Sequence, residues 1–206
     1  MFTNFWEEKQ YPPKVMLMNE AVIALLSEGR DINSLKVSEI TQKAGIGKGT
    51  AYEYFVNKEE MIAAALEYNL ASVIANLVER EADAVDFRDM LVRMTEWLAE
   101  NYRQNVGFTL LFQKEQQPQR ISIEMRRALQ DKCPGTEVVE QMIEQVLAVG
   151  EKEGIIQKKH PYYGTVAIIS QIMAYTFYLS DENLAGEISE ADARDFVVEN
   201  IIKMLN

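Results

Sequence analysis

Cysteine is almost absent from the sequence, because Cys133 is the only one among the 206 residues. One cysteine excludes an internal disulfide and leaves a thiolate metal site without its other ligands. Histidine is equally scarce: His160 stands alone next to Pro161, and a lone histidine does not make a metal site. We therefore expect no metal and no cofactor, and a reducing compartment, the cytoplasm.

Long apolar runs and leader segments are also lacking. The longest apolar run, 165–179, contains Gln171 and is shorter than the roughly 20 residues that cross a bilayer. The N-terminal segment MFTNFWEEKQYPP is acidic and has no long apolar core, which is not typical of a signal peptide. The sequence also lacks a paired base and nucleophile, a metal cluster and a cofactor loop. We expect neither a membrane partner nor an enzyme.

Basic charge is in short supply, with 21 Lys and Arg against 32 Asp and Glu and a net charge of -11. Residues 1–60 carry only -2 of this charge, which leaves -9 for residues 61–206. An acidic chain is a poor partner for nucleic acid as a whole, because phosphate contacts favour a basic surface. Four lysines nevertheless surround one glycine-rich segment: Lys36, Lys43, Lys48 and Lys58. Any nucleic-acid contact is therefore expected within the first 60 residues.

Strand patterns are nearly absent, whereas apolar residues recur at helical spacing throughout the chain. Val15, Met18 and Val22 begin the first such stripe, and Gly29 is a plausible end of that helix. Short helices are expected over 37–44 and 47–54, and a long fourth helix begins at a capping residue, Asn57. Further helices are expected near 84–105, 107–116, 120–131, 136–153, 162–181 and 189–205. The predicted fold class is all-α.

The segment GIGKGTAYEYF, residues 45–55, has the composition of a phosphate-binding loop but not its spacing. A Walker loop requires Lys to be followed directly by Ser or Thr, whereas Gly49 separates Lys48 from Thr50. The preceding residues are helical in pattern, and a nucleotide loop follows a strand. A short helix, a glycine turn and a second short helix instead predict a helix-turn-helix, whose second helix enters the major groove of DNA. Gly47 and Gly49 would let its backbone approach the duplex closely.

The stretch VSEITQKAGIGKGTAYEYFVNKEEMI, residues 37–62, resembles the DNA-binding segment of the TetR family of tetracycline-repressor-like regulators. The shared pattern is Ala-Gly-Ile, a small residue, Lys-Gly-Thr, then Tyr-Phe and Lys-Glu. The resemblance covers the first helix and residues 37–61, and it implies a homodimer. It also implies an N-terminal three-helix DNA-binding head, residues 1–56, and a C-terminal helical ligand-binding and dimerisation domain, residues 57–206.

The same resemblance implies roles for individual residues of the head. Lys48, Gly49 and Tyr52 correspond to positions that face the groove, and Thr50, Tyr54 and Lys58 to phosphate contacts. Lys36 or Ser38, at the start of the second helix, are further candidates for phosphate contacts. Many family members carry a basic arm before the first helix, but Glu7 and Glu8 stand there in this chain, so we expect no arm contact. Glu53 either accepts a hydrogen bond from cytosine or faces solvent.

The C-terminal part contains aromatic and methionine residues that can line an apolar pocket for a small-molecule effector. The candidates are Trp97, Tyr102, Phe108, Phe112, Met142 and Tyr175, and the alternative for each is ordinary core. The helix near 162–181 is apolar nearly all round, and with the helix near 189–205 it is the expected dimer interface. The alternative is that both are buried within one subunit.

The predicted function is that of a ligand-responsive transcriptional repressor, which a small molecule releases from a double-stranded DNA operator. An activator would use the same head, so repression and activation both remain open. A third possibility is an all-α protein-interaction module that keeps the helix-turn-helix only as a scaffold. The effector, the operator and the regulated genes do not follow from the residues.

Overall fold

The computed structural model of the chain describes residues 11–81, 84–105, 107–110, 122–132, 136–157 and 160–206. These residues form helices joined by turns, without a strand among them, which confirms the predicted all-α class. The chain folds into two compact units. The head unit combines Trp6–Ala75 with Arg103–Gly135, and the body unit combines Asn76–Tyr102 with Thr136–Asn206. The predicted functional division between residues 56 and 57 stays a prediction.

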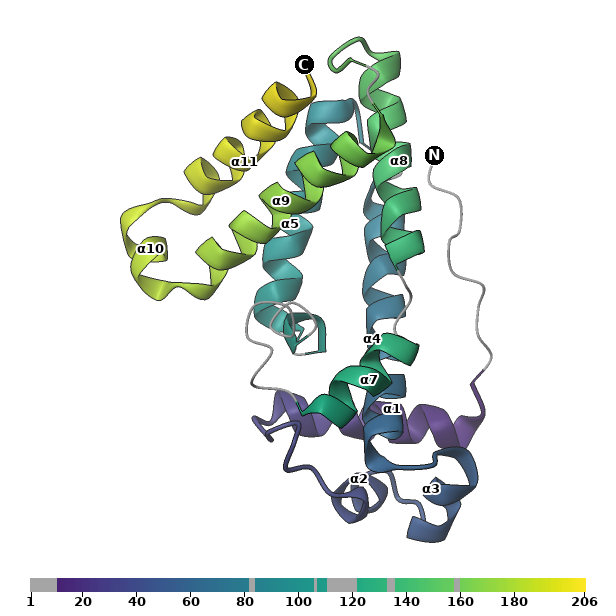
Figure 1. Ribbon diagram of the computed structural model, residues 1–206. Coiled ribbons are helices and arrows are strands. Elements are labelled where there is room, and N and C mark those ends of the chain that lie inside the picture. Colours follow the sequence, from purple (N-terminus) through teal and green to yellow (C-terminus); the bar gives the residue numbers. More distant parts are fainter. Residues whose placement is uncertain (1–10, 82–83, 106, 111–121, 133–135, 158–159) are drawn as a thin grey trace. The chain divides into compact units, whose positions relative to one another are not determined.

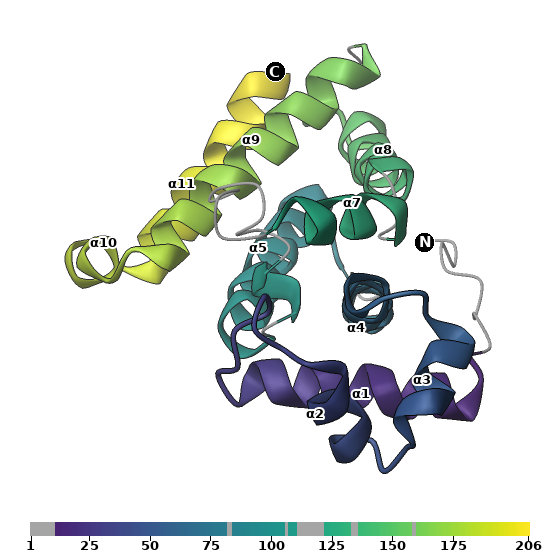
Figure 2. The same cartoon turned by 60° about the horizontal axis from the view of Figure 1, so that its bottom comes forward.

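Five labelled helices contribute to the head unit (Figures 1 and 2). They are α1 (Pro13–Ser27), α2 (Val37–Lys43), α3 (Lys48–Tyr54), the first part of α4 (Lys58–Glu81) and α7 (Ile123–Lys132). Residues 107–110 are helical as well. The predicted N-terminal helices thus begin and end within a few residues of their expected positions.

The ends of α1 follow from its proline and glycine residues. Pro13 occupies the first turn, where the helix has no use for the missing N–H. At the other end Gly29 has φ +83, and the N–H groups of Gly29 and Arg30 donate to the carbonyls of Leu26 and Leu25. This pair of bonds is the Schellman motif, which a left-handed glycine permits at little cost.

Helix α4 starts at the predicted capping residue. The Asn57 side chain accepts a hydrogen bond from the Glu60 N–H at 2.8 Å, and the Glu60 carboxylate accepts one from the Val56 N–H at 2.8 Å. The first bond satisfies a donor that the helix leaves free at its N-terminus, and the second ties the residue before the cap to the first turn. The long helix therefore begins at a fixed point only three residues after the end of α3.

A single hydrophobic core holds the head unit together, and α7 takes part in it. Met18 and Val22 of α1, Ile40 of α2 and Ile62 of α4 are all fully buried. From α7, Met125 and Leu129 enter the same cluster, each with 1% of its surface exposed. A segment far along the chain is therefore a structural part of the head.

The body unit contains the other helices of the described residues. These are the end of α4, most of α5 (Phe87–Gln104), α8 (Thr136–Lys152), α9 (Pro161–Ser180), α10 (Glu182–Glu187) and α11 (Glu190–Leu205). Four of these match predicted ranges, whereas α10 was not predicted. The Asp181 carboxylate caps α10 by accepting from the N–H groups of Asn183 and Leu184.

Two glycines allow close contact between helices of the body unit. A Cβ atom on Gly150 of α8 would lie 2.9 Å from the ring of Phe87, and one on Gly164 of α9 would lie 2.2 Å from Leu147. Both contacts are possible only because glycine has no Cβ atom, since real Cβ atoms do not approach other atoms so closely. Gly164 thus lets α9 lie close to α8.

Helices α9 and α11 pack side by side (Figure 1). Val197, Ile201 and Leu205 of α11 are buried, as their four-residue spacing predicts. Phe196 is 67% exposed, because it lies about 100° around the helix from Val197. Within the described residues, no helix combines the length and apolar character needed to cross a membrane.

Candidate nucleic-acid interface

The turn between α2 and α3 is a second Schellman motif. Gly45 has φ +67, the Gly45 N–H donates to the Gln42 carbonyl at 3.2 Å, and the Ile46 N–H donates to the Thr41 carbonyl at 2.9 Å. These bonds satisfy carbonyls at the end of α2 and turn the chain sharply toward α3. The glycine turn expected between the two short helices is therefore confirmed, and the left-handed residue in it is Gly45.

Side chains around α2 fix its position on the head. The Glu39 carboxylate accepts from the Lys36 N–H at 2.9 Å and so caps the start of the helix. Glu39 also pairs with Arg30, from the loop after α1. At the other end of α2, the Lys43 ammonium lies 2.5 Å from the Glu28 carboxylate. Helix α2 is thus tied to the end of α1 at both of its own ends.

Helix α3 divides into a buried side and an exposed side. Ala51 and Phe55 are buried in the head core. Lys48 and Glu53 are exposed, and Tyr52 and Tyr54 keep 51% and 39% of their surface exposed. The head therefore holds α3 by two apolar residues and presents its lysine, tyrosines and glutamate outward.

Gly47 and Gly49 differ from Gly45 in what the fold requires of them. Neither has a positive φ, and a Cβ atom added at either would meet no atom within 4 Å. Among the described residues, nothing explains why a side chain is missing at these two positions. Together they leave open space at the start of α3.

The remaining predicted DNA contacts lie around this surface. Lys36 and Ser38 are exposed at the start of α2, and Thr50 is partly buried. Lys58 is engaged within the head, because its Nζ donates to the Asn33 carbonyl at 2.7 Å and lies 3.6 Å from Glu59. A DNA contact by any of these residues stays a prediction.

The predicted effector-binding residues are buried wherever the structure describes them. Trp97, Tyr102, Met142 and Tyr175 belong to the body unit, and Phe108 belongs to the head unit. Burial raises the pKa of Tyr102 more than a hydrogen bond with Ser180 lowers it. Phe112 lies outside the described residues. Burial suits core residues and pocket residues alike, so the ligand role of this set stays a prediction.

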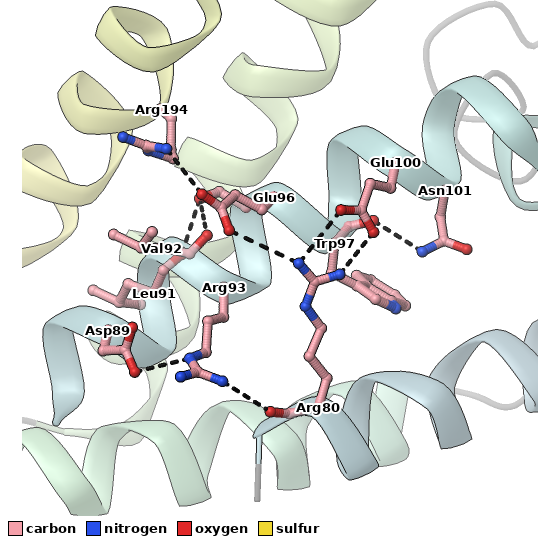
Figure 3. A network of polar contacts seen from close by, with 11 residues as sticks. Arg80, Asp89, Leu91, Val92, Arg93, Glu96, Trp97, Glu100, Asn101 and Arg194 are labelled. Atoms are coloured by element: carbon pink, nitrogen blue, oxygen red, sulfur yellow. Dashed lines mark hydrogen bonds and ion pairs between the residues drawn. The ribbon is translucent and has the colours of Figure 1, made fainter. Parts of the chain in front are cut away.

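A network of charged side chains joins three helices of the body unit (Figure 3). Arg80 of α4 lies 2.7 Å from Glu100 and 3.8 Å from Glu96, both on α5. On its other side Glu96 accepts from Arg194 of α11 at 2.9 Å. The hydrogen bond and the charge of Asp195, with smaller contributions from Glu96, raise the pKa of Arg194, although burial lowers it. Sequence reasoning did not predict this network, since its members come from distant segments.

A second ion pair joins α5 to α11. Arg88 donates to Glu199 at 2.6 Å. That hydrogen bond raises the pKa of Arg88 and lowers the pKa of Glu199. The positions of the two pairs, Arg88 with Glu199 and Glu96 with Arg194, show that α5 and α11 run antiparallel.

Comparison with known proteins places this geometry in a family. Residues 23–65, which include α2, the glycine turn and α3, match the family described as "Bacterial regulatory proteins, tetR family". This segment of the chain is therefore similar to the DNA-binding segment of the TetR family, which confirms the predicted resemblance.

Two relatives in Bacillus subtilis (strain 168) are 31% identical to this chain over short segments. One is the "Uncharacterized HTH-type transcriptional regulator YxbF", aligned over 75 residues, and the other is the "Fatty acid metabolism regulator protein", aligned over 71 residues. Each alignment covers 34% of this chain, but only 20% and 36% of the respective relative. The chain thus matches about a fifth and about a third of these relatives' lengths.

Solved structures resemble the chain over nearly its whole length. The fatty acid degradation regulator FadR from Bacillus halodurans has a TM-score of 0.66 and 17% identity, and covers 96% of this chain and 97% of its own. FadR from Bacillus subtilis in complex with stearoyl-CoA has a TM-score of 0.64 and 16% identity, and the match covers 93% of this chain and 97% of FadR. RolR in complex with resorcinol has a TM-score of 0.63 and 18% identity, and the match covers 94% of this chain and 87% of RolR. At such low identity, these likenesses show the fold alone.

Proposed function

We propose that this chain is a ligand-responsive transcriptional regulator of the TetR family that binds a double-stranded DNA operator through α3. The observation that carries the proposal is the outward side of α3, where Lys48 and Tyr52 stand beside two glycines that the fold does not require. A major groove roughly 12 Å wide admits one helix with its side chains. The small residues let the α3 backbone come near the sugar-phosphate ridges, and Lys48 supplies a charge for phosphate or base contacts.

The remaining contacts in this proposal surround α3. Thr50, Tyr54 and Lys36 or Ser38 bind phosphate groups, which fixes the register of the head on the duplex. Lys58 contributes only when its Nζ leaves the Asn33 carbonyl, which it holds at 2.7 Å. The strong negative charge of the rest of the chain disfavours contact elsewhere.

The regulator acts as a homodimer through α9 and α11 in this proposal. Helix α9 is apolar on its exposed side as well as on its buried side, and its exposed residues include Tyr162, Val166, Ile169 and Phe177. Phe196 and Met204 extend this surface on α11. A contiguous apolar surface of this kind marks an interface. Two copies related by a two-fold axis would form a four-helix interface and space the recognition helices about one DNA turn, roughly 34–36 Å, apart.

A small molecule is the proposed signal. The similar structures hold ligands as unlike as stearoyl-CoA and resorcinol, so the effector class must be measured for this chain. The effector must favour the conformation that does not bind DNA, and a coupling of about 1–3 kcal/mol changes operator affinity about 5- to 150-fold. Release from the operator makes the chain a repressor.

The deciding experiment is a gel shift with the DNA upstream of the chain's own gene at two salt concentrations. We expect a retarded band that weakens at the higher salt. Lys48→Ala and Tyr52→Ala are expected to weaken binding, whereas Lys152→Ala, at an exposed position of α8, is expected not to. Loss of one phosphate contact reduces the slope of the logarithm of the binding constant against the logarithm of the salt concentration by about 0.9. Absence of a retarded band at either salt concentration would instead favour the protein-interaction module.

Addition of stearoyl-CoA or resorcinol to the DNA complex tests the effector. Dissociation of the complex by either compound identifies the class of ligand. A transcription assay with the same fragment separates repression from activation, because both would show the same band.

A further inference from the structure

Helix α7 reaches the helix-turn-helix through one polar residue, Asn33, in the loop between α1 and α2. The Ser122 N–H, just before α7, donates to Asn33 Oδ1 at 3.2 Å. Ser122 is also the cap of α7, since its Oγ accepts from the Met125 N–H at 3.1 Å. The Asn33 carbonyl accepts from Lys58 Nζ at the start of α4. Asn33 therefore joins the starts of α4 and α7.

The side chain of Asn33 is not needed to build its own loop. Asp31 makes the turn, because its Oδ1 accepts from the N–H groups of Asn33 and Ser34, each at 3.0 Å. No residue other than glycine has a positive φ in the described part of the chain, so the Asn33 backbone does not select asparagine. The side chain also holds Ser122, the residue just before α7.

This loop leads directly into α2. Leu35 and Val37 are buried in the head core on either side of Lys36. A shift at Asn33 is therefore passed to the start of α2, and through the turn at Gly45 to α3. Because Met125 and Leu129 anchor α7 in the same core, α7 and the helix-turn-helix move as one packed body.

We propose that Asn33 is a positioning residue through which α7 sets the orientation of the helix-turn-helix on DNA. The inference rests on the proposed DNA-binding function and adds a second route to it. The chain passes between the body unit and the head unit along α4, and again before and after the segment Arg103–Gly135 that carries α7. A signal from the body unit can thus reach the head through α7 as well as along α4.

Reciprocity gives this proposal a direct readout. If α7 orients the head for DNA, then DNA binding must stabilise α7 by the same coupling free energy. Amide hydrogen exchange of residues 122–129 is therefore expected to slow when the upstream DNA is added to the wild-type protein. A side chain that merely supports the fold would leave this DNA-dependent change in exchange unaffected.

Two variants of the full chain separate the bond from the rest of the residue. Asn33→Leu keeps a similar volume and removes the acceptor, and Asn33→Asp keeps an acceptor for the Ser122 N–H. Asn183→Leu, at an exposed position of α10 in the body unit, is the matched control. We expect Asn33→Leu to bind the DNA about fivefold more weakly, which corresponds to one hydrogen bond. We also expect it to lose the DNA-induced slowing in residues 122–129, which Asn33→Asp and Asn183→Leu retain.

The proposal would be overturned if Asn33→Leu bound the DNA as tightly as the wild type and kept the DNA-induced slowing of hydrogen exchange in α7. A wild-type protein that does not bind the DNA at all would overturn the proposed function, which is a different result. Thermal melting of each variant checks folding. If Asn33→Leu melts well below the wild type, Asn33→Ala replaces it in both measurements.

Discussion

Gly49→Ala is expected to make the protein more stable and a poorer DNA binder at the same time. Gly49 lies in α3 with an ordinary φ, and a Cβ atom there would meet nothing within 4 Å. Alanine in a helix is more favourable than glycine by roughly 0.5–1 kcal/mol, mainly because the unfolded chain loses freedom. Near the start of a short helix we expect a gain of about 0.5 kcal/mol, which raises Tm by about 1–2 °C.

DNA binding is expected to change in the opposite direction. If the α3 backbone touches the duplex at Gly49, an added methyl group must push the helix away or distort its contacts. Overpacking of this kind costs about 1–3 kcal/mol, so operator affinity is expected to fall at least about fivefold. The assays are calorimetry or circular dichroism for Tm, and fluorescence anisotropy with labelled upstream DNA for affinity.

Gly186→Ala is the matched control for this experiment. Gly186 also lies in a helix, α10, with no atom within 4 Å of an added Cβ, but it belongs to the body unit. It is expected to stabilise the chain without any change in DNA affinity. Wild-type affinity of the Gly49→Ala variant would refute the reasoning that the missing side chain serves approach to DNA.

Three further changes test other parts of the structure. Gly45→Ala forces alanine to φ +67 and is expected to cost about 1 kcal/mol in urea unfolding; an unchanged midpoint would contradict the strain. Arg88→Ala removes the hydrogen bond that lowers the pKa of Glu199. A lowered carboxyl pKa stabilises the fold at pH values above the ordinary pKa of 4.5, and this stabilisation is lost as the pH falls through the pKa of the folded state. The Tm of Arg88→Ala is therefore expected to lie slightly below that of the wild type at pH 7 and to equal it in acid. A difference in Tm that does not depend on pH would exclude this pair as its cause. Phe177→Asp places a charge in the exposed apolar surface of α9, where Phe177 is 57% exposed, and is expected to weaken dimerisation at least about tenfold in sedimentation velocity; a dimer of wild-type strength would move the interface elsewhere.

Local patterns in the sequence predict most helices of this chain. Apolar residues at helical spacing mark α1 and α11, and the left-handed glycines at positions 29 and 45 end α1 and α2. The cap at Asn57 places the start of α4. Each signal works because it involves residues within one helical turn of each other. Helix α10 has a capping residue, Asp181, but ENLAGE has only six residues and an interior glycine, which is too short for a periodic apolar pattern.

Contacts between distant segments could not be predicted in this way. The spacing of Met125 and Leu129 predicts that one side of α7 is buried, but it does not reveal that the partner is the core of the head. The bond from Ser122 to Asn33 and the pair of Arg194 with Glu96 likewise join segments far apart in sequence. Propensity and periodicity describe one helix at a time, and the packing partner is set by the whole fold.

The presence of α7 in the core of the head has a practical consequence for engineering. A chimera that joins this head to another regulator's effector domain by a cut at residue 56 would leave Met125 and Leu129 behind. The transplanted helices would then expose the apolar surface that these two side chains cover. A functional graft must carry residues 122–132 along with the N-terminal helices, so two separate pieces of the gene have to be exchanged together.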